Sequence, residues 1–515
     1  MTGFLTIPEL FEATVERSAS KTWLRYEDST YSYEESLDRI SSIGAALADL
    51  GVERGTRVLA TTRNSPDYLL TWLAVVRLGA TFVPVNPKST AGELAGLAGQ
   101  VEPPVVVTDA GLSDVVEEAL REAAPEARVV LAEDLMKAPS VSAPPPAARE
   151  DDVAVMIPTS GTTGRSKLVM QTQRAYAMAG EGFPWWMELT EDDRLMTSLP
   201  LFHINAPAYS TLGSVAAGAG LVLLPRFSAS TFLDSARKYG ATEFNAIGAM
   251  IEILMRQPEK DDDAETPLRL CYTGPAPPKE RHLEIERRFG LKIVSGYALS
   301  ETPYATIWKR GTRPYGTLGS VRQHPTMGEI NRGRVMSDGK EVGVGETGEL
   351  ELKNPAVMLG YYKMPEETAK VLVDGWLKTG DLVEVNGDDT FTFVGRRKEL
   401  IRRRGENLSP LEVQDALEAH PAVAEAAVIG VPSDLSEEEI KAYVVIAEGA
   451  DVSMTELRDF VAGKLAPFKV PRYFEVVDDL PHTPTGRIAK HELPTGRTED
   501  EEDLDPQTTE PKGKQ

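Results

Sequence analysis

Apolar and polar positions alternate along the first half of the chain in a rhythm of short strands and amphipathic helices. Apolar residues recur at helical spacing over 4–19 and 33–50, and Ser32 with Glu35 forms a capping-box pattern before the second run. Further helices are predicted at 65–78, 92–98, 115–123, 207–217, 230–239, 250–256 and 280–289. Strands are predicted at 57–62, 80–85, 105–108, 128–132, 153–157, 195–199, 220–224, 243–247, 268–272 and 292–295. This alternation indicates an α/β fold with parallel-type sheets covered by helices.

The pattern changes twice further on. After about Gly316, short alternating runs separated by Gly, Asp and Asn are typical of an antiparallel or barrel-like sheet. From about Lys398, two helices and three strands indicate a small α+β unit. Because 515 residues are too many for one core, we predict an N-terminal domain at 1–397, with a β-barrel-like subdomain at about 316–397, and a C-terminal domain at 398–493. The polar stretch 494–515 is predicted to be a disordered acidic tail.

The composition excludes several classes of function. A net charge of -24 argues against nucleic acid or an anionic membrane as the main partner, so an anionic substrate has to be held by local positive groups. Cys271 is the only cysteine and the six histidines lack a zinc spacing, so neither a disulfide framework nor a cysteine-based metal site is expected. The N-terminus lacks the pattern of a secretion signal, and the apolar runs are too short to cross a bilayer. A cytoplasmic location is therefore expected.

One loop carries the strongest chemical signal. The predicted strand at 153–157 is followed by Pro158-Thr-Ser-Gly-Thr-Thr-Gly-Arg-Ser-Lys167, in which hydroxyls, glycine backbone and one ammonium can approach a polyanion. The spacing is not that of a Walker loop. A plain Ser/Thr/Gly surface turn is the alternative. The clustering of hydroxyls beside the lysine favours a nucleotide-phosphate loop.

Three later segments could complete such a site, although each has an ordinary structural explanation. Gly296-Tyr-Ala-Leu-Ser-Glu301 offers an aromatic ring, a hydroxyl and a carboxylate suited to Mg²⁺, or else a simple strand exit. Trp376-Leu-Lys-Thr-Gly-Asp381 places an acid where ribose hydroxyls could bind, or forms a hairpin turn. Gly395-Arg-Arg-Lys398 is a basic run between the barrel-like stretch and the C-terminal α+β unit, and it is either a solvated edge or a hinge that could meet phosphates. Residues 343–348 match a dinucleotide pattern but open no helix, so we interpret them as a turn.

In their order along the chain, these segments resemble the core motifs of the adenylate-forming enzymes, the superfamily of acyl-CoA synthetases, adenylation domains and luciferases. The resemblance also includes Phe202-His203, Gly405-Glu-Asn407 and Pro484-Thr-Gly-Arg487, and it covers roughly 4–493. Within the superfamily, residues 225–258 look most like carnitine/crotonobetaine-type and medium-chain acyl-CoA ligases.

The resemblance implies a two-step ligase. A carboxylate attacks ATP to give acyl-AMP and pyrophosphate, a small mobile C-terminal domain turns about Lys398, and a thiol, usually CoA, displaces AMP. The phosphates of ATP would be held by Thr159, Ser160, Gly161, Thr162, Thr163, Gly164 and Lys167. The purine would lie against Gly274, Pro275, Ala276 and Tyr297, the ribose would bind Asp381 and Arg396, and Ser300 would contact phosphate. Glu301 would hold Mg²⁺, and Gly405 would lie beside the pantetheine tunnel.

The chain departs from the family pattern at its C-terminal catalytic lysine, where it has Arg487. Arginine keeps the charge but is not a simple substitute for an ammonium, and Lys490 is the alternative cation. Leu168 and Gln173 stand where the family usually has Gly and His. Three functions therefore stay open: an acid–CoA ligase, a related enzyme with another acceptor or nucleophile (such as a nitrite-activating diazotase), and a degenerate nucleotide-binding protein.

The acyl site is the least defined part of the resemblance. With His203 as a further catalytic candidate, it would be lined by Trp185, Trp186, Asn205, Phe244, Ile247, Gly248, Met250 and Ala298. These side chains favour an apolar acyl or aryl acid, although core packing explains several of them equally well. Whether the chain forms a homodimer is left open.

Overall fold

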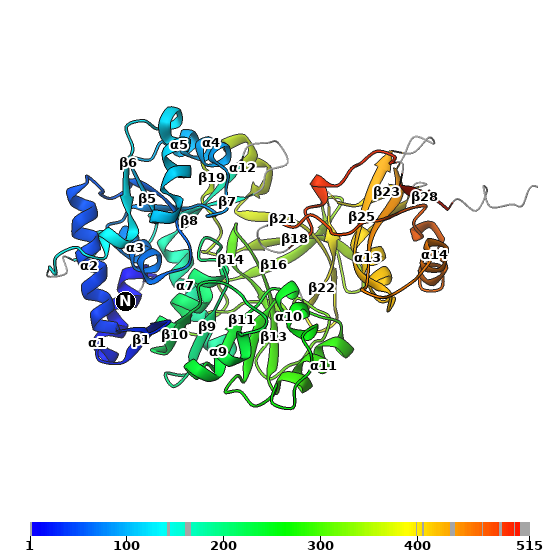
Figure 1. Cartoon of the computed structure of the whole chain (residues 1–515), viewed down its shortest axis with the longest axis horizontal. Helices are drawn as coiled ribbons and strands as arrows, with labels where there is room; N and C mark the ends of the chain where they lie inside the picture. The colour runs from blue at the N-terminus through cyan, green and yellow to red at the C-terminus, as the bar shows by residue number, and fades with distance from the viewer. Residues whose placement is uncertain are drawn as a thin grey trace, which may run out of the picture. The chain divides into compact units, whose positions relative to one another are not determined.

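The computed structural model describes residues 3–141, 145–159, 166–274, 276–397, 399–403, 406–432, 438–465, 467–483, 487–498 and 500–504. Contacts divide the chain into two compact units. The large unit comprises residues 1–334, 351–379 and 388–391, and the small unit comprises 335–350, 380–387 and 392–515. The elements of the large unit run from blue to yellow-green in Figure 1, and α13, α14 and β25 of the small unit are orange.

A nine-stranded sheet forms one half of the large unit, in the order β15-β14-β13-β12-β11-β9-β10-β1-β2. The strands from β1 to β13 in this order are parallel, and the outer pairs β1·β2, β13·β14 and β14·β15 are antiparallel. Their bounds are β1 (Thr22–Tyr26), β2 (Ser29–Ser32), β9 (Arg194–Thr197), β10 (Gly220–Leu223), β11 (Glu243–Asn245), β12 (Leu270–Thr273), β13 (Lys292–Leu299), β14 (Thr302–Ile307) and β15 (Ser320–Val321).

A seven-stranded sheet follows the order β19-β8-β7-β4-β3-β5-β6. Its strands are β3 (Arg57–Thr61), β4 (Thr81–Pro84), β5 (Val105–Thr108), β6 (Arg128–Leu131), β7 (Val153–Thr159), β8 (Lys167–Thr172) and β19 (Gly360–Tyr361). Alternate residues of β3 enter different cores, Val58 and Ala60 on one face and Leu59 on the other. Both faces are therefore buried, as the continuous apolar runs predict.

Helices cover these faces. The bounds are α1 (Ile7–Ser18), α2 (Tyr33–Asp49), α3 (Pro66–Arg77), α4 (Ala91–Val101), η1 (Ala110–Leu112), α5 (Ser113–Ala123), α6 (Ala132–Leu135), α7 (Gln173–Met187), the π-helix η2 (Ala206–Thr211), α8 (Leu212–Ala217), α9 (Phe232–Tyr239), α10 (Gly248–Met255), α11 (Lys279–Phe289) and α12 (Pro365–Val371). Helices α4 and α5 share one core with the seven-stranded sheet and lie together in Figure 1. The predicted capping box is confirmed, because the Ser32 hydroxyl accepts from the Glu35 N–H while Glu35 accepts from the Ser32 N–H.

The stretch predicted to be barrel-like forms a further sheet, in the order β17-β16-β18-β21-β20 with β22 on β21. Its bounds are β16 (Arg332–Ser337), β17 (Lys340–Glu341), β18 (Thr347–Lys353), β20 (Leu372–Val373), β21 (Trp376–Val385) and β22 (Phe391–Arg396). The turn at 343–348 is confirmed: Gly345 has φ +82° and its N–H donates to the Val385 carbonyl at 2.8 Å. Together with the two larger sheets, this arrangement confirms the predicted α/β class.

The small unit contains a four-stranded sheet in the order β25-β26-β27-β28. Its elements are β23 (Ile401–Arg403), β24 (Glu406–Leu408), α13 (Pro410–Glu418), β25 (Val423–Pro432), β26 (Glu438–Ile446), α14 (Met454–Ala462), η3 (Pro467–Lys469), β27 (Tyr473–Val476), η4 (Lys490–Glu492) and β28 (Glu501–Asp503). The expectation of a disordered tail from 494 is wrong for residues 500–504, because β28 pairs with β27. Arg472 holds Asp503 at 2.9 Å, a long-range partner that local composition does not reveal.

Candidate active site

The predicted phosphate loop joins two paired strands. Thr159 ends β7 and is the register partner of Lys167, the first residue of β8, and the Thr159 hydroxyl donates to the Lys167 carbonyl at 3.2 Å. The hairpin therefore fixes both ends of the loop side by side. Between them, Ser160, Gly161, Thr162, Thr163 and Gly164 lie outside the described residues.

The Lys167 ammonium lies in a small cluster of charged and aromatic groups. It pairs with Glu367 of α12 at 2.7 Å and lies 4.8 Å from the centre of the Tyr361 ring. The hydrogen bond to Lys167, with a second lysine at position 370, lowers the pKa of Glu367 to about 2. The Tyr361 hydroxyl in turn donates to the Glu301 carboxylate at 2.9 Å. The structure thus brings two predicted site residues, Lys167 and Glu301, together through Tyr361.

The backbone around Glu301 is fixed by strand β8 and its neighbour. Gln171 donates to the Ser300 carbonyl at 2.6 Å, and the Met358 N–H donates to the Glu301 carbonyl at 2.8 Å. Among the described residues, no cation lies within 4.0 Å of the half-buried Glu301 carboxylate. A carboxylate held in place without a cationic partner fits a role as a Mg²⁺ ligand.

The predicted purine segment depends on a close approach of two strands. A Cβ at Gly274, just after β12, would lie 2.1 Å from the Gly296 carbonyl oxygen on β13, so only glycine fits there. Strand β13 continues through Tyr297 and Leu299 and turns directly into β14, so this segment is a strand hairpin rather than an exit into a loop. Ala276 follows the close approach, and Pro275 lies outside the described residues.

The predicted ribose residues meet on the small unit. Asp381 is buried on β21, and the partly exposed Arg396 at the end of β22 holds its carboxylate at 3.0 Å. The preceding Gly380 has φ +74°, a conformation that favours glycine, and its N–H donates to Glu349 at 2.9 Å. Lys398 and Gly405 lie outside the described residues.

The two candidate C-terminal cations lie in different surroundings. Arg487 is exposed. Its backbone carbonyl accepts a hydrogen bond from the Thr483 N–H at 2.7 Å. Lys490 is partly buried, and burial lowers its pKa although Glu399, Glu418 and Asp415 oppose that effect. The exposed guanidinium of Arg487 is thus the one presented to solvent.

The predicted acyl residues separate into inward and outward positions. Trp186 is buried and donates from its indole to the Gln323 carbonyl at 2.9 Å, whereas Trp185 is 40% exposed with the Arg310 guanidinium over its ring. Adjacent helical residues point in different directions, so only one of the pair faces inward. The Asn205 side chain accepts from Asn245 at 2.6 Å, and the His203 ring lies 4.4 Å from that of Phe202.

The other predicted acyl residues lie on β11, α10 and β13. Phe244 packs edge-on against Phe232, and Met250 is buried in the same core. Ile247 and Ala298 are partly buried against it, and Gly248 has open space around its Cβ position. The motifs did not point to Tyr361, Gln171 and Glu367, because their partners are distant in sequence.

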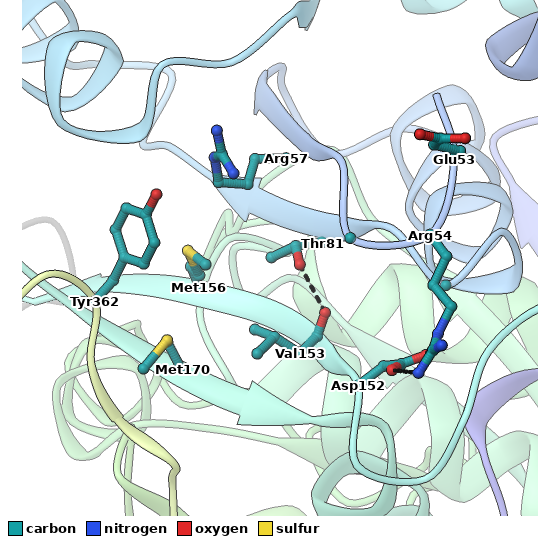
Figure 2. A pocket seen from close by; sticks show the side chains of 11 residues that line it. Glu53, Arg54, Arg57, Thr81, Asp152, Val153, Met156, Met170 and Tyr362 are labelled. Atoms are coloured by element: carbon teal, nitrogen blue, oxygen red, sulfur yellow. Dashed lines mark hydrogen bonds and ion pairs between the residues drawn. The ribbon is translucent and has the colours of Figure 1, made fainter. Parts of the chain in front are cut away.

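A separate cavity of about 650 Å³ lies beside β3, β4, β7 and β8 (Figure 2). Tyr362 lies at one end, the Arg54–Asp152 ion pair at the other, and Met156 and Met170 between them. The Thr81 hydroxyl donates to the Val153 carbonyl at 2.8 Å, so several of its polar groups are already paired. None of the described residues that line it belongs to the predicted active site.

Comparison with known proteins decides the family. Residues 11–362 match the model of the AMP-binding enzymes, and residues 412–487 match that of the AMP-binding enzyme C-terminal domain. The chain belongs to the AMP-binding enzyme family. The predicted resemblance is therefore confirmed, and the first match spans the hairpin of β7 and β8 as well as Tyr361.

Similar proteins cover nearly the whole chain. Crotonobetaine/carnitine–CoA ligase of Escherichia coli is 31% identical over 90% of this chain and 93% of its own. The crystal structure of ATP-bound MatB from Rhodopseudomonas palustris matches with TM-score 0.86 and 29% identity, covering 95% of this chain and 98% of that one. The o-succinylbenzoate CoA synthetase MenE from Bacillus subtilis, in complex with its acyl-adenylate, matches with TM-score 0.84 and 26% identity over 95% and 98%. In the described part of this chain, no helix combines the length and apolarity needed to cross a membrane.

Proposed function

We propose that this AMP-binding enzyme is an acid–CoA ligase that activates a carboxylic acid with ATP and passes the acyl group to CoA. The observation that carries the proposal is the cluster of Lys167, Tyr361 and Glu301 at the end of the β7–β8 hairpin. It joins one ammonium and one carboxylate where a strand hairpin fixes the ends of a hydroxyl-rich loop. Such a site suits a nucleotide triphosphate and its metal ion.

The first step needs charge neutralisation and positioning more than covalent help. A carboxylate oxygen bonds to the α-phosphorus of ATP while the bond to pyrophosphate breaks. Lys167 is proposed to leave Glu367 for the departing phosphates, and Tyr361 to orient the Glu301 carboxylate. Glu301 would hold Mg²⁺, which when bound supplies further neutralisation of phosphate charge. The adenine is proposed to lie beside Gly274, where the backbones of β12 and β13 approach closely.

The second step transfers the acyl group. The thiol sulfur bonds to the acyl carbon, and AMP leaves with the electron pair of the broken acyl–phosphate bond. The ribose is proposed to bind Asp381 and Arg396, and Arg487 to face the α-phosphate in the first step. Arginine keeps the positive charge required there, and its planar fork can bind two phosphate oxygens. The acid is proposed to be an apolar acyl or aryl acid, because its predicted neighbours are mainly apolar and aromatic.

The test is pyrophosphate release from ATP with a panel of carboxylic acids, with and without CoA. Acid-dependent release together with a thioester product is expected. Release without a thioester would instead mean another acceptor, and release only with nitrite and an aryl amine would mean a diazotase. No release under any condition would leave a nucleotide-binding protein.

Two matched variants test the site itself. Glu301→Gln should lower pyrophosphate release at least about 100-fold at saturating Mg²⁺, because a metal ligand becomes a neutral amide. Glu366→Gln changes an exposed glutamate on α12 and should leave the rate within about twofold. Equal rates for Glu301→Gln and the wild type would show that Glu301 is not the metal ligand.

A further inference from the structure

Arg322 is a fully buried arginine beside the predicted acyl residues. It follows β15, and its side chain points into the large unit with no exposed surface. Its Nε donates to the Thr306 carbonyl at 3.0 Å and one terminal nitrogen donates to the Pro303 carbonyl at 3.2 Å. The other terminal nitrogen donates to the Tyr272 hydroxyl. Every one of these partners is a neutral oxygen.

Aromatic rings complete the surroundings of the guanidinium. Its carbon lies 4.7 Å from the centre of the Trp186 ring, 4.8 Å from that of Tyr209 and 5.7 Å from that of Tyr272. Ring faces stabilise a cation but do not neutralise it. Among the described residues, no carboxylate lies within 4.0 Å of the guanidinium. Because arginine cannot lose its proton in a protein, the buried charge remains uncompensated.

Glu181, an acid of the same region, interacts with other groups. Glu181 of α7 raises the pKa of Tyr304, after burial, and its carboxylate lies 3.8 Å from the His324 ring. The Tyr304 hydroxyl is buried and has no hydrogen-bond partner among the described residues. The Arg322 charge lowers the pKa of the same tyrosine, which places the two groups near each other. A positive charge and an unused hydroxyl thus lie together in the interior.

This interior adjoins the predicted substrate positions. Trp186 is one of them, and Ala298 follows Tyr297, whose carbonyl lies 3.5 Å from an Arg322 nitrogen. Asn205, another of them, is held by Asn245, and Asn245 is the register partner of Tyr272 on the next strand. One predicted acyl residue, Trp186, thus contacts the guanidinium, and Ala298 and Asn205 are linked to it through Tyr297 and Tyr272. In a low-dielectric interior, a unit charge near a binding site changes the binding of a charged ligand by about tenfold or more.

We propose that Arg322 sets the charge selectivity of the acyl site. The site accepts acids whose acyl group is neutral or carries a second negative or hydrogen-bond-accepting group, and it rejects acids with a cationic acyl group. This inference rests on the proposed ligase function and specifies its substrate class. It separates the chain from the relatives named for crotonobetaine and carnitine, since both of those acids carry a quaternary ammonium group.

A pair of acids of equal shape tests the proposal. One is 4-(trimethylammonio)butanoate, and the other is its uncharged isostere 5,5-dimethylhexanoate. For the wild type, kcat/KM for acid-dependent pyrophosphate release should be at least about tenfold higher with the uncharged acid. Arg322→Met should bring the two values within about threefold. A ratio measured within one variant does not depend on how much of the protein is folded.

Arg310→Met is the matched control. Arg310 also lies over a tryptophan ring, that of Trp185, but it is exposed and pairs with Glu188 at 2.9 Å, so its loss should leave the ratio unchanged. Equal or better use of the cationic acid by the wild type would overturn the proposal. If no acid supports pyrophosphate release, the proposed function fails. The charge preference of the site is then measured by comparing the melting temperature of the protein with ATP and each of the two acids. Equal or greater stabilisation by the cationic acid would overturn the proposal there too.

Discussion

Two buried positive charges, one in each unit, have opposite surroundings. In the small unit, the fully buried Lys441 ammonium lies 2.8 Å from both Glu475 and Glu501. In the large unit, the partners of the equally buried Arg322 among the described residues are carbonyls, a hydroxyl and ring faces. A buried charge with its opposite beside it serves the fold, whereas one without a counter-charge is costly for the fold. The difference therefore separates structural charges from charges available to a ligand.

Two acidic groups, one in each unit, show the same contrast. In the small unit, the buried Glu439 pairs with Arg403 at 2.7 Å. In the large unit, Glu301 has a tyrosine hydroxyl but, among the described residues, no cation within 4.0 Å. Glu243 is buried there as well, and burial raises its pKa well above its usual value. An arginine lacks that escape, which makes Arg322 the informative case.

The largest expected effect concerns the paired charge. Lys441→Met should lower the free energy of unfolding of the small unit by about 3 kcal/mol, because Glu475 and Glu501 lose a shared buried partner. Urea denaturation of the full chain, followed by hydrogen exchange in β26, measures it. Lys469→Met removes a more exposed pair with Glu412 and should cost about 1 kcal/mol or less. If Lys441→Met and Lys469→Met lowered the free energy of unfolding equally, the buried pairing of Lys441 would not be a special source of stability.

A smaller effect tests whether Lys167 binds ATP although it forms an ion pair with Glu367. Lys167→Met should raise KM for ATP about tenfold, because one charge-assisted contact to phosphate is lost. Lys370→Met is the control, since Lys370 contacts the same Glu367 from an exposed position. It should leave KM for ATP within about twofold. If KM for ATP changed equally in both variants, Lys167 would have a structural role like that of Lys441 and no special role in binding ATP.

The smallest effect is a pH dependence beside Arg487. The His482 ring lies 2.7 Å from Glu425, whose hydrogen bond and charge outweigh partial burial and raise the pKa of His482. A raised histidine pKa contributes stability in full at pH below the unfolded value and loses it as the pH rises through the folded value. Glu425→Gln should therefore cost about 0.5 kcal/mol at pH 5.5 and almost nothing at pH 9, measured by thermal denaturation.

The control for this pH effect is Glu492→Gln. Its partner His491 is exposed and lies 3.7 Å away, so the change should have little effect at either pH. A cost of Glu425→Gln that stays the same at both pH values would show that charge pairing does not hold this hairpin.

Local patterns predicted most of the strands of the two large sheets. The run 105–108 is β5 without change, because a continuous apolar stretch between polar residues suits a strand buried on both faces. Strand β8 and helix α7 were not predicted. Strand β8 begins with Lys167, and its buried Gln171 interrupts the apolar run. Strand β28 was misjudged because its acids look solvated, whereas Lys441 and Arg472 bind them from distant positions.

The candidate site also contains residues that the sequence identified and residues that only the structure reveals. Motifs identified Thr159, Lys167 and Glu301, which the β7–β8 hairpin and Tyr361 bring together. Arg322 carries no local signal, because an arginine after a short strand usually indicates a surface position. Only the folded chain reveals that aromatic side chains from α7, η2 and β12 enclose it.

Strand β28 has a consequence for how the small unit avoids aggregation. It covers the edge of β27, whose hydrogen-bonding groups would otherwise be open to another chain. The new edge consists of Glu501, Glu502 and Asp503, of which Glu501 and Asp503 are paired with Lys441 and Arg472 and Glu502 is exposed. The family match ends at residue 487, so a protein shortened to that match would lose this cover and bare the edge of β27. Strand β28 thus replaces the edge of β27 with a short strand of acidic residues.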